Sequence, residues 1–222
     1  MLTVPLRAQS TPGGGTFVSP FPKGETYKIF VFGDSLASGL FDGLRKGLRL
    51  APNVRVENRT RPSARLTRLR PYDWVSSMHS IVKSEPFDIA VMNFGVNDRG
   101  FVRIDGRRFA VGTPEWKKVY GQRLNGLLKA VRAKGAAVYW VGLPVMRGPR
   151  ASADAEVMNA IAREWVYRHG GKYVDTWEGF TTGEGNFSPY GPDLTGKIRR
   201  LRSRDGVYFT VRGYRKFAHF VE

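Results

Sequence analysis

The chain has 222 residues, 41% of them hydrophobic, which is enough for one medium-sized globular domain with a buried core. It contains no cysteine, which excludes disulfides, thiolate metal sites and a cysteine nucleophile. No run of about 18 apolar residues predicts a transmembrane helix, and the first residues do not resemble a signal peptide. The net charge of +17 favours an anionic partner, such as an acidic glycan, an anionic membrane surface or nucleic acid. A generally basic, solvated surface is the alternative.

Residues 1–25 are rich in glycine and proline and are predicted to form a flexible tail or linker, followed by a single domain over residues 26–222. In this domain the hydrophobic pattern alternates between strands and helices. The expected strands are 27–32, 54–58, 87–94, 136–142 and 172–175. The expected helices are 36–50, 72–85, 114–134, 152–169 and 211–220. This alternation predicts a three-layer α/β sandwich around a five-stranded parallel sheet.

Two local signals add detail to this outline. An Asp-Gly pair in the alternating segment 102–109 predicts a tight β-hairpin. Ser35 follows Gly33 and Asp34 at the point where the first strand turns into a helix. The free amides and positive dipole end of that helix would stabilise an oxyanion beside the hydroxyl. The alternative is that Ser35 only caps the helix.

The loops after the strands carry much of the positive charge. Ligands of parallel sheets bind at the carboxyl ends of the strands. The segments that follow these ends are 59–71, 97–112, 143–151 and 176–205. Together they hold 16 Lys or Arg residues against six acids. All but one of the 16 are arginine, whose guanidinium fork suits carboxylate, sulfate or phosphate. We therefore expect an anion-binding rim, against the alternative of ordinary solvated loops. Its candidate residues are Arg65, Arg68, Arg99, Arg147 and Arg202.

Three blocks in the same order resemble SGNH/GDSL hydrolases. Gly33–Leu36 is similar to the family's nucleophile block, and Gly95–Asp98 is similar to the block whose Asn donates to the oxyanion. Asp205–Thr210 is similar to the last block, normally Asp-x-x-His before the final helix. The resemblance covers nearly all of residues 27–222. It implies a flavodoxin-like fold with sheet order 2-1-3-4-5, and ester hydrolysis or acyl transfer at sugars and lipids. It implies no metal and no organic cofactor.

Further stretches sharpen the resemblance to an exported bacterial subfamily that is common in rhizobia-like bacteria. They are Tyr72–Trp74, Trp140–Pro144 and Leu201–Gly206. This resemblance implies a periplasmic or otherwise exported protein.

The resemblance also exposes a departure at the catalytic base. It places Ser35 as the nucleophile and Asp205 as the triad acid, but Tyr208 stands where the family has histidine. A phenol, with an ordinary pKa near 10, accepts a proton poorly at neutral pH. Loss of one triad member typically leaves about 10³–10⁴-fold catalysis over water. The three histidines fall outside the strand-end loops and are expected to be structural; they are His79, His169 and His219.

The second departure concerns the oxyanion hole. The resemblance implies donors from the Asn97 side chain and from the backbone of Ser35 and Arg65. Arg65 occupies the position of a family glycine. We expect its guanidinium to pair with Asp205, which lacks its usual histidine.

These observations lead to one main hypothesis and two alternatives. The main hypothesis is a catalytically silent or very weak hydrolase-like domain that binds an anionic cell-envelope glycan, or an envelope protein, through the arginine rim. The first alternative is an active esterase, or an acyl (acetyl) hydrolase or transferase on carbohydrate, with an atypical base. The second is nucleic-acid binding, which the charge alone suggests and no recognised motif supports.

Overall fold

The computed structural model describes residues 26–222. The tail expected over residues 1–25 lies outside them. The central feature is a five-stranded parallel sheet in the order β2-β1-β3-β6-β7. Numbered among themselves, these strands have the expected order 2-1-3-4-5, and the predicted α/β class is confirmed. The strands are β1 Tyr27–Gly33, β2 Val54–Thr60, β3 Ile89–Asn93, β6 Ala137–Val141 and β7 Lys172–Val174.

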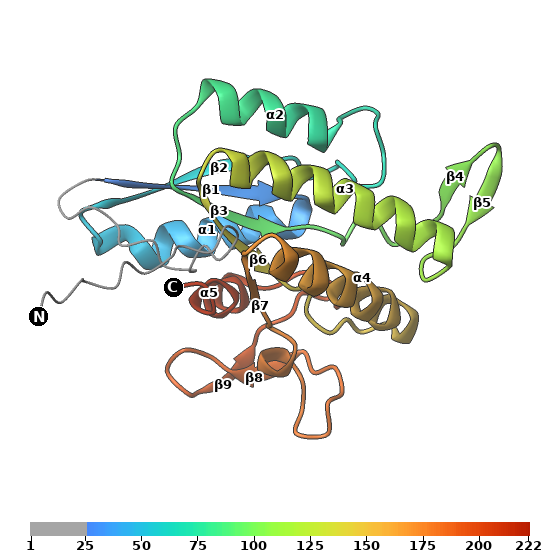
Figure 1. Ribbon diagram of the computed structural model, residues 1–222. Helices are drawn as coiled ribbons and strands as arrows, with labels where there is room; N and C mark the ends of the chain where they lie inside the picture. Colours follow the sequence, from blue (N-terminus) through green and yellow to red (C-terminus); the bar gives the residue numbers. More distant parts are fainter. Residues whose placement is uncertain (1–25) are drawn as a thin grey trace, which may run out of the picture.

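Helices cover both faces of this sheet, which makes three layers (Figure 1). The helices are α1 Ser35–Gly47, α2 Trp74–Ser84, α3 Pro114–Ala133, α4 Pro149–Arg168 and α5 Val211–His219. Helices α1 and α5 pack together on one face, while α2, α3 and α4 lie side by side on the other. Two short 3₁₀ turns complete the helical structure, η1 Leu48–Leu50 and η2 Glu178–Phe180.

The start of α3 shows how the sequence sets an element boundary. Thr113 precedes the helix, and its hydroxyl accepts a hydrogen bond from the Trp116 amide. Pro114 occupies the first turn, where its missing N–H costs no hydrogen bond. Trp116 is then fully buried and stacks on Tyr120 at 4.8 Å. The cap therefore fixes the register in which the apolar face of the helix meets the sheet.

Large aromatic side chains fill the core between the sheet and α2. Trp74 at the start of α2 meets Phe94 edge to face, with ring centroids 4.9 Å apart. Phe94 in turn stacks on Trp140 of β6 at 5.4 Å. All three side chains are buried. This packing holds the segment after β3, which carries Asn97, against the helical layer.

Two small hairpins stand outside the sheet. The predicted one is formed by β4 Val102–Ile104 and β5 Arg107–Phe109. A second, β8 Tyr190–Pro192 with β9 Ile198–Arg200, lies in a segment expected to be a loop. Its connection, residues 193–197, lacks the two-residue Asp-Gly turn that marks the β4–β5 hairpin, which is why the sequence did not reveal it.

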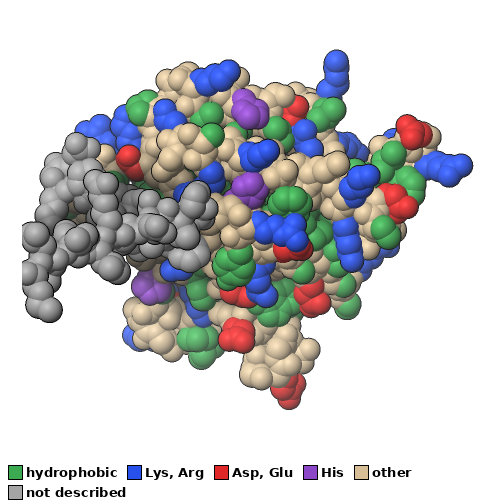
Figure 2. Space-filling view, in the orientation of Figure 1, with side chains coloured by type: hydrophobic (Ala, Val, Ile, Leu, Met, Phe, Trp, Pro, Cys, Tyr) green, Lys and Arg blue, Asp and Glu red, His purple; other side chains and the backbone are tan. Residues whose placement is uncertain are grey.

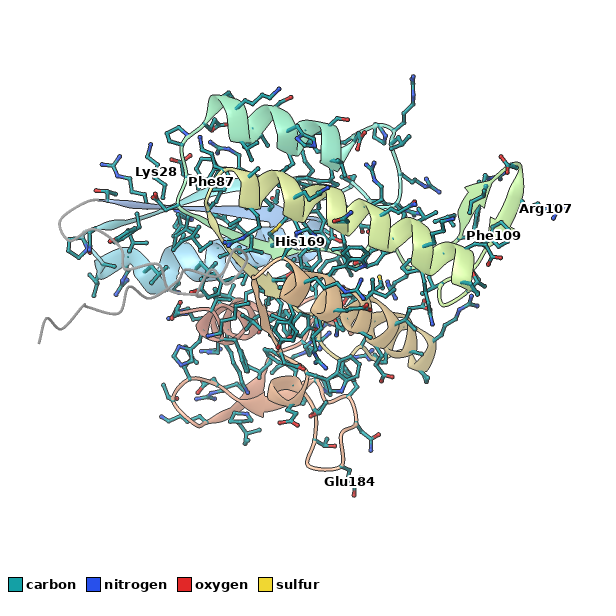
Figure 3. All side chains as sticks on the ribbon, in the orientation of Figure 1. Lys28, Phe87, Arg107, Phe109, His169 and Glu184 are labelled. Carbon is teal, nitrogen blue, oxygen red and sulfur yellow. The ribbon has the colours of Figure 1, made fainter. Side chains whose placement is uncertain are left out.

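The β4–β5 hairpin projects at the carboxyl end of the sheet. Figure 3 shows Lys28 and Phe87, at the amino ends of β1 and β3, on one side of the molecule. Arg107 and Phe109 of the hairpin lie on the opposite side. The hairpin therefore stands at the edge where parallel sheets bind their ligands. Within residues 26–222, no helix has the length and apolar character needed to cross a membrane.

Candidate functional site

The candidate site begins where β1 passes into α1. Gly33 ends the strand with φ +145°, and a Cβ at this position would lie 1.9 Å from the carbonyl oxygen of Asn93. Only glycine therefore permits the ends of β1 and β3 to approach this closely. Asp34 is the N-cap, and its carboxylate accepts the Leu36 amide at 3.1 Å. Ser35 is thus the first helical residue, so the alternative that it acts as the cap is wrong.

The buried carboxylate of Asp34 joins the serine turn to the segment after β3. Its second oxygen accepts the amides of Gly95 at 2.9 Å and Asn97 at 3.4 Å. Burial raises the pKa of Asp34 to about 7, and the charge of Asp98 adds to this, while the amide hydrogen bonds act in the opposite direction. Asp34 therefore fixes the spacing between Ser35 and Asn97.

A second buried carboxylate, that of Asp98, fixes the loop after β2. It accepts the amides of Leu66 at 3.0 Å and Thr67 at 2.8 Å, and also the Thr67 hydroxyl at 2.6 Å. Burial raises the pKa of Asp98, and these hydrogen bonds oppose the rise. Neither Asp34 nor Asp98 was predicted to be a site residue. The signal was present, because each acid follows a buried strand inside one of the recognised blocks.

The phenol of Tyr208 lies against the serine. Ser35 Oγ and Tyr208 OH are 2.8 Å apart, and either oxygen can donate. Both side chains are partly buried. The structure thus brings together two residues that are 173 positions apart in the sequence. Tyr208 therefore lies beside the Ser35 hydroxyl, where the family resemblance predicts a base.

The carboxylate of Asp205 accepts hydrogen bonds from the backbone and not from the Tyr208 phenol. It accepts the amides of Val207 at 2.7 Å and Tyr208 at 3.0 Å, together with the Ser203 hydroxyl at 2.6 Å. Partial burial raises the pKa of Asp205, but these hydrogen bonds outweigh it and hold the pKa below its usual value. Asp205 therefore shapes the turn that presents Tyr208.

The side-chain amide of Asn97 is turned away from the oxyanion position. Its Nδ2 donates to the carbonyls of Pro62 at 2.5 Å and Ala64 at 3.0 Å. Its Oδ1 faces Ser35 Oγ at 3.5 Å, the outer limit of a hydrogen bond. A flipped amide would set its oxygen against two carbonyl oxygens, so the contacts fix this orientation. Asn97 presents an acceptor to the serine, whereas the resemblance implies a donor.

Arg65 does not form the expected pair with Asp205. No ion pair joins these two side chains in the described part of the chain. The guanidinium of Arg65 instead lies beside Gly100, and its charge lowers the pKa of Asp98 against the larger effect of burial. The reason is that Asp205 already has hydrogen-bond partners on its own turn, while Asp98 fixes the loop that carries Arg65.

Arg202 is not a rim residue, which corrects a second expectation. Its side chain is fully buried and donates to the carbonyls of Val145 at 2.6 Å, Gly206 at 3.1 Å and Val207 at 2.9 Å. Its guanidinium also lies 4.5 Å from the ring centroid of Phe209. Burial lowers the pKa of Arg202 to about 10. Arg202 ties the loop after β6 to the Tyr208 turn and has no exposed surface for an anion.

The other three rim candidates lie at or near the surface. Arg68 is exposed, and Arg147 is exposed with its guanidinium 5.6 Å from the Phe187 ring centroid. Arg99 is half-buried, and its Nε donates to the Val96 carbonyl at 3.1 Å. Figure 2 shows Lys and Arg side chains spread over the visible face, on the helices as well as on the hairpin. The excess charge is therefore not confined to the edge that carries Ser35.

The histidines lie in other parts of the fold. His169 makes a 2.8 Å contact with Asn125, and His219 lies 3.4 Å from Glu222. His79 is in α2. Across residues 26–222, no group of three or more His, Asp or Glu side chains is arranged to hold a metal ion.

Known proteins similar to this chain identify its family and its fold. A family model described as protein of unknown function DUF459 matches residues 28–222. No curated protein matches the chain. The α/β hydrolase LAE5 from the metagenome of Lake Arreo, Spain, has a TM-score of 0.67 at 17% identity, covering 93% of this chain and 96% of its own.

Two further solved structures share the architecture. A candidate SGNH hydrolase from Slackia heliotrinireducens has a TM-score of 0.60 at 18% identity, covering 89% of this chain and 97% of its own. A GDSL-like lipase from Bacteroides thetaiotaomicron has a TM-score of 0.62 at 15% identity, covering 92% of this chain and 89% of its own. These likenesses establish the fold. The chain belongs to the DUF459 family of proteins of unknown function and has the fold of the SGNH/GDSL hydrolases.

Proposed function

We propose that this protein is an exported, SGNH-fold binding protein for an anionic cell-envelope glycan, with a hydrolase site that is silent or very weak. The observation that carries the proposal is the 2.8 Å contact between Ser35 Oγ and the Tyr208 phenol. In a serine hydrolase the neighbouring base takes the hydroxyl proton and later returns it to the leaving group. A neutral phenol has a proton to donate and is a poor acceptor.

The neighbouring contacts support the same reading. A phenol that donates to Ser35 leaves the serine proton directed at Asn97 Oδ1, and an amide oxygen is not a base. Asp205 makes its hydrogen bonds to Ser203 and to two backbone amides, so it does not prepare Tyr208 as a proton acceptor. The Asn97 amide nitrogen is held by Pro62 and Ala64, which removes one donor from the oxyanion hole.

An assay of ester hydrolysis tests this proposal. We expect the parent to hydrolyse a short-chain aryl ester no faster than its Ser35→Ala variant, and to react no faster with a fluorophosphonate probe. Tyr208→His should restore Ser35-dependent turnover, because it supplies a base at the same position. Tyr208→Phe is the matched control, since it removes the hydroxyl without adding a base. Clear parental turnover that Ser35→Ala abolishes would overturn the silent site.

The glycan-binding part of the proposal rests on charge and has its own test. Three exposed or half-buried arginines near the sheet edge, Arg65, Arg68 and Arg147, make no ion pair within residues 26–222. Binding to heparin or polygalacturonate that weakens as salt rises supports an anionic ligand. No binding to either polymer at low salt would overturn it.

The second candidate is an active esterase or acyltransferase on carbohydrate. It is favoured by the direct contact of Ser35 with Tyr208, because a phenol in contact with the nucleophile is placed to carry a proton in either direction. The same assay distinguishes the two: turnover by the parent that is lost in both Ser35→Ala and Tyr208→Phe would identify Tyr208 as the proton carrier.

A further inference from the structure

A groove of about 440 Å³ lies between the loop after β2 and the start of the β4–β5 hairpin. Three of its lining residues are arginines, Arg68, Arg70 and Arg103. Its apolar lining comes from Leu69 and Phe101, which are exposed, together with the buried Val102. The volume is within the range of sites that hold small molecules or short chain segments.

The positive charge of this groove is not neutralised by the protein. No acidic side chain lines it. Arg68, Arg70, Arg103 and Arg108 take part in no ion pair with any described residue. Arg59, by comparison, pairs with Glu57 and Glu85, whereas Arg55 on the same strand is in no ion pair with a described residue. Unpaired arginines concentrated around one hollow favour an external anion.

The hairpin holds two of these arginines over one aromatic ring. Arg103 and Arg108 are direct cross-strand partners, an arrangement in which like charges repel. Their guanidinium carbons lie 5.4 and 4.5 Å from the Phe101 ring centroid, where the ring offsets part of the repulsion. An anion bound between the guanidinium groups of Arg103 and Arg108 would remove the remaining repulsion between them.

The same contacts bear on the class of ligand. Nucleic-acid bases bind proteins by stacking on open aromatic faces. The Phe101 ring is exposed but carries two guanidinium groups, which a stacking base would have to displace. Recognition in this groove therefore depends on guanidinium forks, which fit the carboxylate and sulfate groups of acidic polysaccharides.

The groove is rigidly connected to the serine. Thr67, which lines it, donates its amide and hydroxyl to Asp98 at 2.8 and 2.6 Å. The preceding residue, Asn97, contacts Ser35. A chain held in the groove would therefore lie along the edge of the sheet that carries the Ser35–Tyr208 pair.

We propose that this groove is the subsite for an acidic polysaccharide, whose carboxylate or sulfate groups bind Arg68, Arg70 and Arg103 in the groove and Arg108 beside it. The proposal deepens the proposed function and rests on it. It also explains why the hairpin keeps two unpaired arginines opposite each other.

The test compares two triple variants with the same loss of charge. The groove variant is Arg68→Gln/Arg103→Gln/Arg108→Gln. The control is Arg45→Gln/Lys46→Gln/Arg49→Gln, at the carboxyl end of α1, where all three side chains are exposed. Affinity is measured by titration calorimetry for heparin, which is sulfated, and for polygalacturonate, which is carboxylated. Neutral dextran and duplex DNA complete the set.

We expect the groove variant to bind the acidic polysaccharides about tenfold or more weakly, and the control variant less than about threefold. The ratio of heparin to polygalacturonate affinity shows which anion the groove prefers. Equal losses in both variants, or full binding by the groove variant, would overturn the groove while leaving glycan binding in place. DNA binding that is tighter than glycan binding and is lost only in the groove variant would overturn the choice of ligand. No binding of the parent to either polysaccharide would overturn the groove and the proposed function together.

Discussion

Replacement of Arg202 by methionine should destabilise the protein through the carbonyls that it leaves unpaired. Arg202 is fully buried and donates to Val145, Gly206 and Val207 across two loops. Methionine has a similar length and is apolar, so it fills the space without supplying a donor. The change therefore removes hydrogen bonds while it disturbs the packing little.

The expected loss follows from which carbonyls lose every partner. The Gly206 carbonyl also accepts the Arg147 amide at 3.1 Å, so it stays paired. The carbonyls of Val145 and Val207 lose their hydrogen bond, at about 1–3 kcal/mol each for a buried unsatisfied acceptor. The lost contact with the Phe209 ring adds about 0.5–1 kcal/mol, and relief of the buried charge acts in the opposite direction. The net expectation is a loss of about 2–4 kcal/mol in the free energy of unfolding.

Urea unfolding monitored by tryptophan fluorescence measures this loss. With a slope of about 2 kcal/mol/M, the expected midpoint shift is about 1–2 M. Arg204→Met is the control, because Arg204 is exposed on the same loop, and its change should be within about 0.5 kcal/mol. The loss of stability for Arg202→Lys should lie between the losses for Arg202→Met and Arg204→Met, since one ammonium group cannot reach both loops. A loss below about 1 kcal/mol for Arg202→Met would show that the Val145 and Val207 carbonyls do not depend on this side chain.

Three further predictions test the site's supports. Asp205→Asn should destabilise the protein at pH 7 and by a smaller amount near pH 3. The pKa of Asp205 is lowered in the folded state, so its carboxylate contributes stability above the ordinary carboxyl pKa, and this contribution is lost as the pH falls through the folded value; urea unfolding at both pH values measures this. Gly33→Ala should cost about 3 kcal/mol or more, since its Cβ would meet the Asn93 carbonyl at 1.9 Å; thermal unfolding measures it. Asp98→Asn should speed amide hydrogen exchange at Thr67, because the Asp98 carboxylate accepts hydrogen bonds from the Thr67 amide and hydroxyl.

Matched controls separate these effects from general damage. Gly183→Ala should be nearly neutral, because a Cβ there meets nothing within 4 Å. Asp105→Asn at the exposed hairpin tip should leave Thr67 exchange unchanged. Equal losses at both pH values for Asp205→Asn, a neutral Gly33→Ala, or unchanged exchange in Asp98→Asn would each contradict the role assigned to that residue.

Local sequence signals predicted most of the fold because they act within a few residues. The buried runs of β1 and β3, the Thr113 cap and the Asp-Gly turn of the β4–β5 hairpin each depend on neighbouring side chains alone. The β8–β9 hairpin was not predicted, because its connection over residues 193–197 carries no two-residue turn signal. The three-residue strands β8 and β9 depend on pairing with each other, and the 190–192 strand includes a proline.

The order of the three blocks placed Ser35, Asn97 and Tyr208 at one edge of a parallel sheet, and the structure brings them into contact. What the side chains do there depended on competition for partners. The Asn97 amide nitrogen donates to two loop carbonyls, and the Asp205 carboxylate accepts two backbone amides of its own turn. Charge was the least reliable guide, because Arg202 looks like its rim neighbours in the sequence but is buried beneath them.

The alternation of strands and helices could be predicted from the sequence alone, and so could the edge of the sheet at which Ser35, Asn97 and Tyr208 meet. The packing of distant segments was needed to show that the Tyr208 phenol contacts Ser35, that the Asn97 amide nitrogen binds two loop carbonyls, and that Arg103 lines a groove with Arg68 and Arg70. Helix caps and strand patterns depend on adjacent residues, whereas a hydrogen bond between positions 35 and 208 depends on how the whole sheet and its loops pack.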